Sequence, residues 1–179
     1  MLRIIAGSLR GRRIEQPDLK IVRPTTDKTR EAVFSSIQFE IEGSSVLDLF
    51  AGSGAISLEF ISRGAKEVYA SEKNRKIYSF IKQEIEKIKV DNLKLFNVAA
   101  VDLIRMNTNK KFDFVFIDPP YENKELIFEA LELIKAHDIL QQTGKIIIET
   151  NDQKLDFSNF FNVTKIKKYG KTIIYFLER

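Results

Sequence analysis

The chain contains no cysteine and only one histidine, His137, among its 179 residues. Without cysteine there are no disulfides, thiolate metal sites or cysteine nucleophiles. A single histidine argues against paired-histidine metal sites and against a Ser-His-Asp triad within the chain. We therefore expect no bound metal, and we expect any chemistry to depend on carboxylates, backbone groups, aromatic rings and a bound cofactor.

The sequence also lacks an apolar run long enough to cross a bilayer, so we expect no membrane partner. Residues 1–11 are basic but lack the apolar core of a signal peptide. The apolar share of 44% is ordinary for a globular protein, and the length suits one domain. These features predict a cytoplasmic protein.

The net charge of +4 is unevenly distributed. Residues 1–30 hold eight Lys and Arg against three Asp and Glu, a net of +5, whereas residues 31–179 hold 21 against 22, a net of −1. This asymmetry favours a polyanionic partner, nucleic acid before a membrane surface, with a solvated tail as the alternative. We accordingly divide the chain into a basic N-terminal arm with a hairpin, residues 1–30, and a main domain, residues 31–179.

Strand and helix patterns alternate from residue 45 onward. Apolar runs predict strands at 46–50, 67–71, 93–96, 112–117 and 144–149, and helical spacing predicts helices at 55–63, 74–89, 99–106 and 123–136. Residues 161–167 and 172–177 predict a terminal hairpin. Before them, residues 2–7 predict a short strand, Gly7 and Gly11 bracket a turn, and Thr26 or Asp27 caps a helix. The pattern indicates an α/β fold: a mainly parallel sheet with helices on both faces and a C-terminal antiparallel hairpin.

Open parallel sheets bind ligands at the carboxyl ends of their strands, where this chain carries Asp48 and a glycine turn, Gly52-Ser53-Gly54. Ser57 stands where a dinucleotide fingerprint has its third glycine. The acidic residue disfavours a pyrophosphate and favours a cationic ligand, such as a sulfonium or an amino group. Glu72 ends the next strand, where a carboxylate can accept both ribose hydroxyls. The alternatives are helix capping, a surface carboxylate and an ordinary turn.

The segment Asp118-Pro119-Pro120-Tyr121 follows the fourth strand of this series. Two prolines remove two backbone donors and stiffen the loop, which leaves the Asp118 side chain and the Pro119 carbonyl as acceptors. An exocyclic amino group of a base needs two acceptors, and Tyr121 can stack on an extruded base. The alternative is a rigid surface turn, which a position directly after a buried strand disfavours.

These motifs resemble a known family. Residues 48–54 are similar to the cofactor motif of class I methyltransferases, and residues 118–121 to the catalytic motif of enzymes that methylate adenine N6, cytosine N4 or guanine N2. Residues 3–7, 11–12, 23–27, 30–31, 34 and 62–65 resemble one narrower family, the bacterial RsmD type. Its members methylate guanine N2 in small-subunit ribosomal RNA, and the resemblance covers nearly the whole chain.

The resemblance implies a Rossmann-like, seven-stranded fold that uses S-adenosylmethionine. It also implies a guanine of 16S ribosomal RNA as the target, in an assembled or nearly assembled small subunit. We expect the chain to act as a monomer. The implied cofactor-binding residues are Asp48, Phe50, Ala51, Gly52, Gly54, Glu72, Val98, Ala99 and Asp118. The implied catalytic residues are Asp118, Pro119, Pro120 and Tyr121. The implied RNA contacts are Arg3, Arg10, Arg12, Arg13, Thr25, Thr26 and Arg30.

One position departs from the family pattern. Related enzymes often place a polar side chain near Ala99 to accept from the adenine amino group, which alanine cannot do. Backbone groups of Val98 or Ala99, or the side chain of Asn97, are the substitutes that we consider.

Two other functions remain open at this point. The motif at 118–121 also serves adenine N6 methylation of DNA or another RNA, although 179 residues leave little room for the target-recognition domain that sequence-specific DNA enzymes usually carry. A non-catalytic RNA-binding assembly factor on the same scaffold is the alternative of a different class. The intact motifs at 48–54 and 118–121 disfavour it, because a scaffold needs neither.

Overall fold

A computed structural model describes residues 2–15 and 26–179 of the chain. Its helices are α1 (Asp27–Ile37), α2 (Ala55–Ser62), α3 (Arg75–Ile88), α4 (Ala100–Met106) and α5 (Glu125–Ala136). Its strands are β1 (Leu2–Arg3), β2 (Arg13–Ile14), β3 (Ser45–Asp48), β4 (Glu67–Ser71), β5 (Leu93–Phe96), β6 (Phe112–Ile117), β7 (Leu140–Thr150), β8 (Asn162–Tyr169) and β9 (Thr172–Glu178). No helix in these two ranges is long and apolar enough to cross a membrane.

Seven strands form one sheet in the order β5-β4-β3-β6-β7-β9-β8. The first five of that order pair parallel, whereas β9 pairs antiparallel with both β7 and β8. The predicted parallel sheet with a terminal antiparallel hairpin is therefore confirmed. The N-terminal strands β1 and β2 form a separate antiparallel pair.

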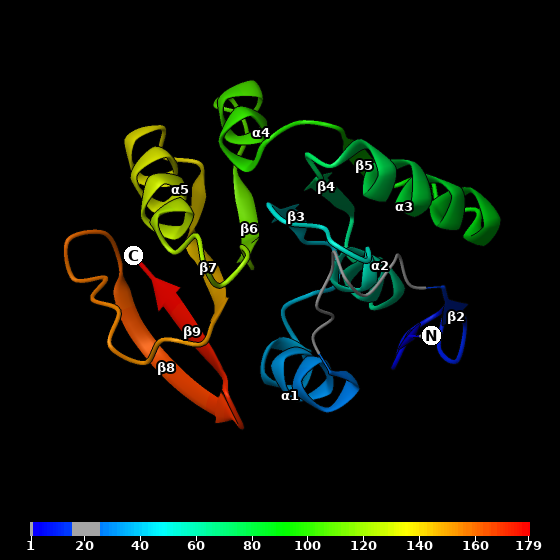
Figure 1. The fold of residues 1–179 in the computed structure, drawn as a ribbon, viewed down its shortest axis with the longest axis horizontal. Helices are drawn as coiled ribbons and strands as arrows, with labels where there is room; N and C mark the ends of the chain where they lie inside the picture. The colour runs from blue at the N-terminus through cyan, green and yellow to red at the C-terminus, as the bar shows by residue number, and fades with distance from the viewer. Residues whose placement is uncertain (1, 16–25) are drawn as a thin grey trace.

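Helices cover both faces of the sheet (Figure 1). One apolar cluster joins α1, α2 and α3 to one face, and a second joins α4 and α5 to the other. Such two-sided burial explains why the central strands are apolar without alternation, as in the sequence of β6, Phe-Asp-Phe-Val-Phe-Ile. The prediction of helices on both faces is confirmed.

Several element boundaries differ from the predictions: β1 ends at Arg3 rather than at residue 7, β3 ends at Asp48 rather than at residue 50, and β8 continues to Tyr169. Thr26 caps α1 by accepting from the Thr29 amide, and Asn74 caps α3 rather than beginning it. Strand β7 begins at Leu140, four residues before the prediction. Leu140 pairs with Phe112 across a shift in register, so the polar segment between Leu140 and Gly144 continues the strand instead of forming a turn.

The N-terminal hairpin is packed onto the domain. Leu2, Ile4 and Ile14 are buried in the same apolar cluster as α1, α2 and α3. Figure 1 shows the hairpin beside α2, far from the C-terminal strands. The described part of the basic arm is therefore anchored at a defined place on the surface.

Candidate active site

The carboxyl ends of β3, β4 and β6 are joined by hydrogen bonds just beyond the strands. The Leu49 amide donates to the Phe116 carbonyl at 3.0 Å, and the Ala51 amide donates to the Ser71 carbonyl at 2.9 Å. The Ser71 hydroxyl donates back to the Leu49 carbonyl at 2.8 Å. These contacts bring the segments that carry Asp48, Glu72 and Asp118 to one edge of the sheet.

Asp48 lies beneath the glycine turn and is completely buried. Its Oδ2 accepts a 2.5 Å hydrogen bond from the Ser57 hydroxyl, while its Oδ1 has no hydrogen-bond partner. Burial raises the pKa of Asp48 to about 6, which the Ser57 hydrogen bond and the nearby Phe50 amide only partly offset. A buried carboxylate oxygen without a donor fits a cationic or amino group at this edge.

The glycine turn has a structural requirement of its own. Gly52 and Gly54 adopt positive φ angles of 56° and 77°, a region that favours glycine. A Cβ on Gly54 would also lie 2.9 Å from Cγ2 of Ile81 on α3. Close packing against α3 therefore accounts for Gly54 without a ligand. Between Asp48 and this turn, Ala51 is buried and Phe50 is half-buried.

Glu72 sits half-buried at the end of β4. Its Oε1 accepts from the Asn74 amide at 2.7 Å. Burial raises the pKa of Glu72, while hydrogen bonds from the amides of Asn74 and Gly52 lower it. The involvement of the Gly52 amide places this carboxylate directly against the glycine turn.

Residues 97–99, which we consider for the adenine contact, already form hydrogen bonds with neighbouring residues. The Asn97 amide nitrogen donates to the carbonyls of Glu72 at 2.8 Å and Lys73 at 3.2 Å. The Ala99 carbonyl accepts two amides of the first turn of α4. Val98 is half-buried beside the second apolar cluster. The Asn97 side chain thus braces the β4 and β5 ends against one another.

The loop after β6 is stiff and partly exposed. Asp118 and Tyr121 are half-buried, Pro119 is buried, and Pro120 is exposed. The Tyr121 hydroxyl lies 3.3 Å from the hydroxyl of Thr172 at the start of β9. Thr172 was not among the predicted site residues, because only the pairing of β7 with β9 brings it to this edge.

The predicted RNA contacts divide into three groups. Arg3, Arg10, Arg12 and Arg13 are exposed on the N-terminal hairpin, although Arg12 also donates to the Ile88 carbonyl. Thr26 is exposed at the start of α1. Thr25 lies outside the described residues.

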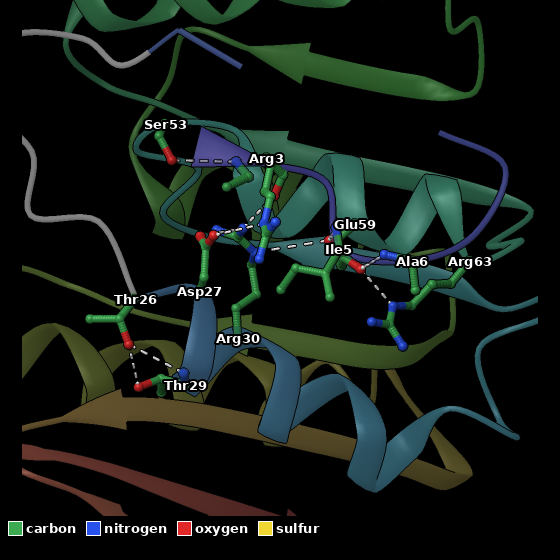
Figure 2. Close-up of polar contacts among 11 residues, drawn as sticks. Arg3, Ile5, Ala6, Thr26, Asp27, Thr29, Arg30, Ser53, Glu59 and Arg63 are labelled. Atoms are coloured by element: carbon green, nitrogen blue, oxygen red, sulfur yellow. Dashed lines mark hydrogen bonds and ion pairs between the residues drawn. The ribbon is translucent and has the colours of Figure 1, made fainter. Parts of the chain in front are cut away.

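Arg30 forms the third group and requires a correction. Its side chain is 1% exposed, so it cannot reach an RNA phosphate in this structure. The guanidinium donates to the Arg3 carbonyl and to Asp27 at 3.0 Å, and it lies 3.9 Å from Glu59 (Figure 2). Arg30 therefore links α1 to β1 and α2 from inside the protein.

Glu59 on α2 accepts several hydrogen bonds from the N-terminal segment, and the sequence predictions did not include it. It is completely buried, and it accepts from the amides of Ile5 at 2.8 Å and Ala6 at 3.1 Å and from Arg63 at 2.7 Å (Figure 2). The sequence does indicate a buried role for Glu59, because it is the only charged residue of α2, whose other residues are apolar or small. This carboxylate holds the N-terminal hairpin on α2.

Within residues 2–15 and 26–179, no group of three or more His, Asp or Glu side chains is arranged to hold a metal ion. The chemistry available at the edge consists of two carboxylates, Asp48 and Glu72, and the proline-stiffened loop with Asp118 and Tyr121.

One family model, several curated proteins and several solved structures are similar to this chain over most of its length. The family model described as conserved hypothetical protein 95 matches residues 2–178. A Buchnera aphidicola protein named ribosomal RNA small subunit methyltransferase D is 32% identical over 82% of this chain and 76% of its own length. The Escherichia coli K12 protein of the same name is 32% identical over 83% of this chain and 74% of its own. A solved Escherichia coli structure, described provisionally as a methyltransferase, has a TM-score of 0.87, with 29% identity over 99% of this chain and 97% of that one.

Proposed function

The chain belongs to the RsmD-type methyltransferase family, as its motifs predicted, and on that premise we propose its reaction. It transfers a methyl group from S-adenosylmethionine to the exocyclic N2 of a guanine in 16S ribosomal RNA. The substrate is an assembled or nearly assembled small ribosomal subunit. Such a substrate implies work in the cytoplasm, where we propose that the chain acts as a monomer.

The single observation that carries the proposal is the meeting of two different motifs at one sheet edge. Asp48 with its glycine turn and Glu72 suit a cationic ligand with a ribose, whereas Asp118 and Tyr121 suit an amino-bearing base. The two sets are linked through backbone hydrogen bonds between the β3, β4 and β6 ends. A methyl donor and an acceptor base bound there would face one another.

The residues present fit the cofactor. The unpartnered Oδ1 of Asp48 is available to an amino group, and the Glu72 carboxylate lies where it can accept from ribose hydroxyls. We assign Phe50, Ala51, Gly52 and Gly54 to the turn around the methionine part, and Val98 and Ala99 to the adenine. When bound, S-adenosylmethionine supplies the electrophilic methyl group.

The loop after β6 then orients the acceptor. The Asp118 carboxylate and the Pro119 carbonyl accept the two amino protons of the base, which directs the nitrogen lone pair away from them. Pro120 removes an amide that would compete for these acceptors. The Tyr121 ring stacks on the base, and its hydroxyl contact with Thr172 fixes the ring. The amino group loses one proton to solvent during or after its attack on the methyl group, so no histidine base is required.

The pKa of Asp48 leads to a pH-dependent prediction. A cation beside Asp48 favours its ionised form, so binding at pH 5 must displace a proton from a carboxyl whose pKa is about 6. We expect cofactor affinity to rise by up to about tenfold per pH unit below 6 and to level off above 7. Calorimetry from pH 5 to 8 measures this directly. Asp48→Asn should bind weakly with no such rise, and an unchanged slope in that variant would contradict the assignment.

The two alternatives make different demands on this site. Adenine N6 methylation uses the same acceptor geometry, so only the identity of the product separates it from guanine N2 methylation. A non-catalytic assembly factor has no need for a buried, unpartnered carboxylate oxygen beside the glycine turn. The names of the curated relatives support small-subunit ribosomal RNA as the substrate, whereas the choice of guanine rests on the family resemblance.

The test is methyl transfer with product identification. Small ribosomal subunits from a host that lacks this activity, and duplex DNA as the control, are incubated with the protein and radioactive S-adenosylmethionine. We expect label in the subunits only, and N2-methylguanosine after digestion. Labelled N6-methyladenosine, or labelled DNA, would support the second activity. Cofactor binding without any label in the subunits would support the assembly factor.

A further inference from the structure

An open hollow of about 360 Å³ lies at the edge of the sheet occupied by the proposed base-holding loop. We call it the lysine hollow. Its lining comes from the segment after β7 and from the turn between β8 and β9. The polar lining side chains are Asn151, Asp152, Gln153, Lys154, Lys168 and Lys171, and Gly170 and Ile173 complete the lining.

The strand register places the lysine hollow next to the proposed site. Ile117 of β6 pairs with Ile148 of β7. Thr150, at the end of β7, pairs with Ile173 at the start of β9. The β8–β9 turn therefore lies at the carboxyl ends of the parallel strands. Two side-chain contacts join this edge to the loop after β6. The Tyr121 hydroxyl lies 3.3 Å from that of Thr172 at the start of β9, and Lys124, just before α5, pairs at 2.8 Å with Asp152 in the segment after β7.

The charge of the lysine hollow is positive. Three lysines and one aspartate line it, and the aspartate is already paired with Lys124. The hydrogen bond from Lys124 and a second one from the Lys154 amide hold the pKa of Asp152 below its usual range, so Asp152 stays ionised and paired with Lys124. Lys154 attracts Asp152 electrostatically and so shares that carboxylate with Lys124. Among the described residues, Lys168 and Lys171 form no ion pair, and the Lys168 amine donates to the neutral Gln153 side chain at 3.3 Å.

We propose that the lysine hollow binds the phosphate backbone of the ribosomal RNA strand beside the target guanine. The inference rests on the proposed function and deepens it, because it adds a second RNA contact opposite the N-terminal hairpin. Lysine ammonium groups hold the phosphates, and Asn151 and Gln153 offer amide groups to the adjoining sugar or base. The RNA backbone held in the lysine hollow and the base stacked on Tyr121 would belong to neighbouring nucleotides. Thr172 contacts Tyr121, and Lys171, the residue before Thr172, lines the hollow.

A structural role explains these lysines less well. Strand β8 is an edge strand, and lysines on edge strands prevent pairing with other chains. Lys165 on the same strand is exposed and can serve that purpose, whereas the Lys167 amine donates to the Ser36 hydroxyl on α1. Lys154 and Lys171 lie outside β8, yet they converge on the same hollow.

The experiment compares three forms of the full-length protein: wild type, Lys168→Gln/Lys171→Gln, and the control Lys66→Gln/Lys82→Gln. The control removes the same charge from exposed positions before β4 and on α3. Binding to small ribosomal subunits is measured across a salt series, together with methyl transfer and cofactor affinity. Each phosphate contact contributes about 0.7–0.9 to the slope of log affinity against log salt.

We expect the Lys168→Gln/Lys171→Gln variant to flatten that slope by about 1.4–1.8 and to raise the KM for subunits. Its kcat at saturating subunits and its cofactor affinity should match wild type. Equal slopes and affinities in wild type and variant would overturn the inference, even if subunits are methylated normally. A flattened slope in a protein that methylates no subunits would leave the RNA contact standing and reject the proposed function.

An acidic protein is the competing occupant, and protein-free 16S ribosomal RNA separates it from RNA. If RNA fills the lysine hollow, the variant loses affinity for protein-free RNA as well as for subunits. Loss of affinity for subunits alone would assign the hollow to a ribosomal protein and overturn the proposal.

Discussion

Replacing Asp118 with alanine is expected to reduce methyl transfer by at least about 100-fold while cofactor affinity stays near that of wild type. The carboxylate is proposed to accept one amino proton of the guanine and so to aim the nitrogen lone pair at the methyl donor. Without it, the base remains stacked on Tyr121 but rotates away from the productive geometry. Single-turnover methylation of small subunits measures the rate, and calorimetry measures the affinity.

Asp118→Asn serves as the matched control. Asparagine keeps one oxygen acceptor at the same position but lacks the negative charge, so we expect a rate between those of wild type and Asp118→Ala. Since Asp118 is half-buried in a loop rather than in the core, both variants should fold. Turnover by Asp118→Ala within tenfold of wild type would move the acceptor role to another group.

Replacing Glu59 with alanine is expected to lower the free energy of unfolding by about 3–5 kcal/mol. The change removes the acceptor of two backbone amides and of Arg63, and it leaves the buried Arg30 with a less compensated charge. The loss should release the N-terminal hairpin first, because the Ile5 and Ala6 amides lose their partner. Urea denaturation measures the stability, and limited proteolysis of residues 2–15 reports the release of the hairpin.

Two further variants test this explanation of the Glu59 effect. Glu59→Gln retains an oxygen acceptor and the side-chain volume, so its loss should be smaller than that of Glu59→Ala. Adding Arg30→Met to Glu59→Ala removes the buried guanidinium charge, which Glu59 no longer helps to compensate. The double variant should therefore recover part of the lost stability. A loss below about 1 kcal/mol for Glu59→Ala would show that the hairpin is held by its apolar contacts alone.

The fold was largely predictable because the period of apolar residues is local information. Strands β4, β5 and β6 lie where their apolar runs predicted them, and the Gly170 turn correctly indicated the β8–β9 hairpin. The start of β7 was not predictable from its own residues. Its first part is polar and is a strand only because Leu140 pairs with Phe112, a contact between segments far apart in the chain.

The shared position of the candidate site residues was predictable where residue type and strand end coincide. Asp48, Glu72 and Asp118 follow apolar runs, and parallel pairing brings such ends to one edge. The resemblance placed Arg30 among the RNA contacts, but the side chain is buried against Glu59, which lies 29 residues later in a buried helix. Pairing between distant charged residues leaves no local pattern. The same reason hid Thr172, which reaches Tyr121 only through the sheet.

Strand β3 pairs with neighbours that are made at different times during synthesis. Its partner β4 follows within 25 residues, whereas its other partner, β6, begins only at Phe112. Until β6 leaves the ribosome, one edge of β3 stays open and the Leu49 amide lacks the Phe116 carbonyl. A segment that ends before Phe112 therefore lacks one of the three strand ends that form the candidate site, so this edge is complete only when segments far apart in the chain have paired.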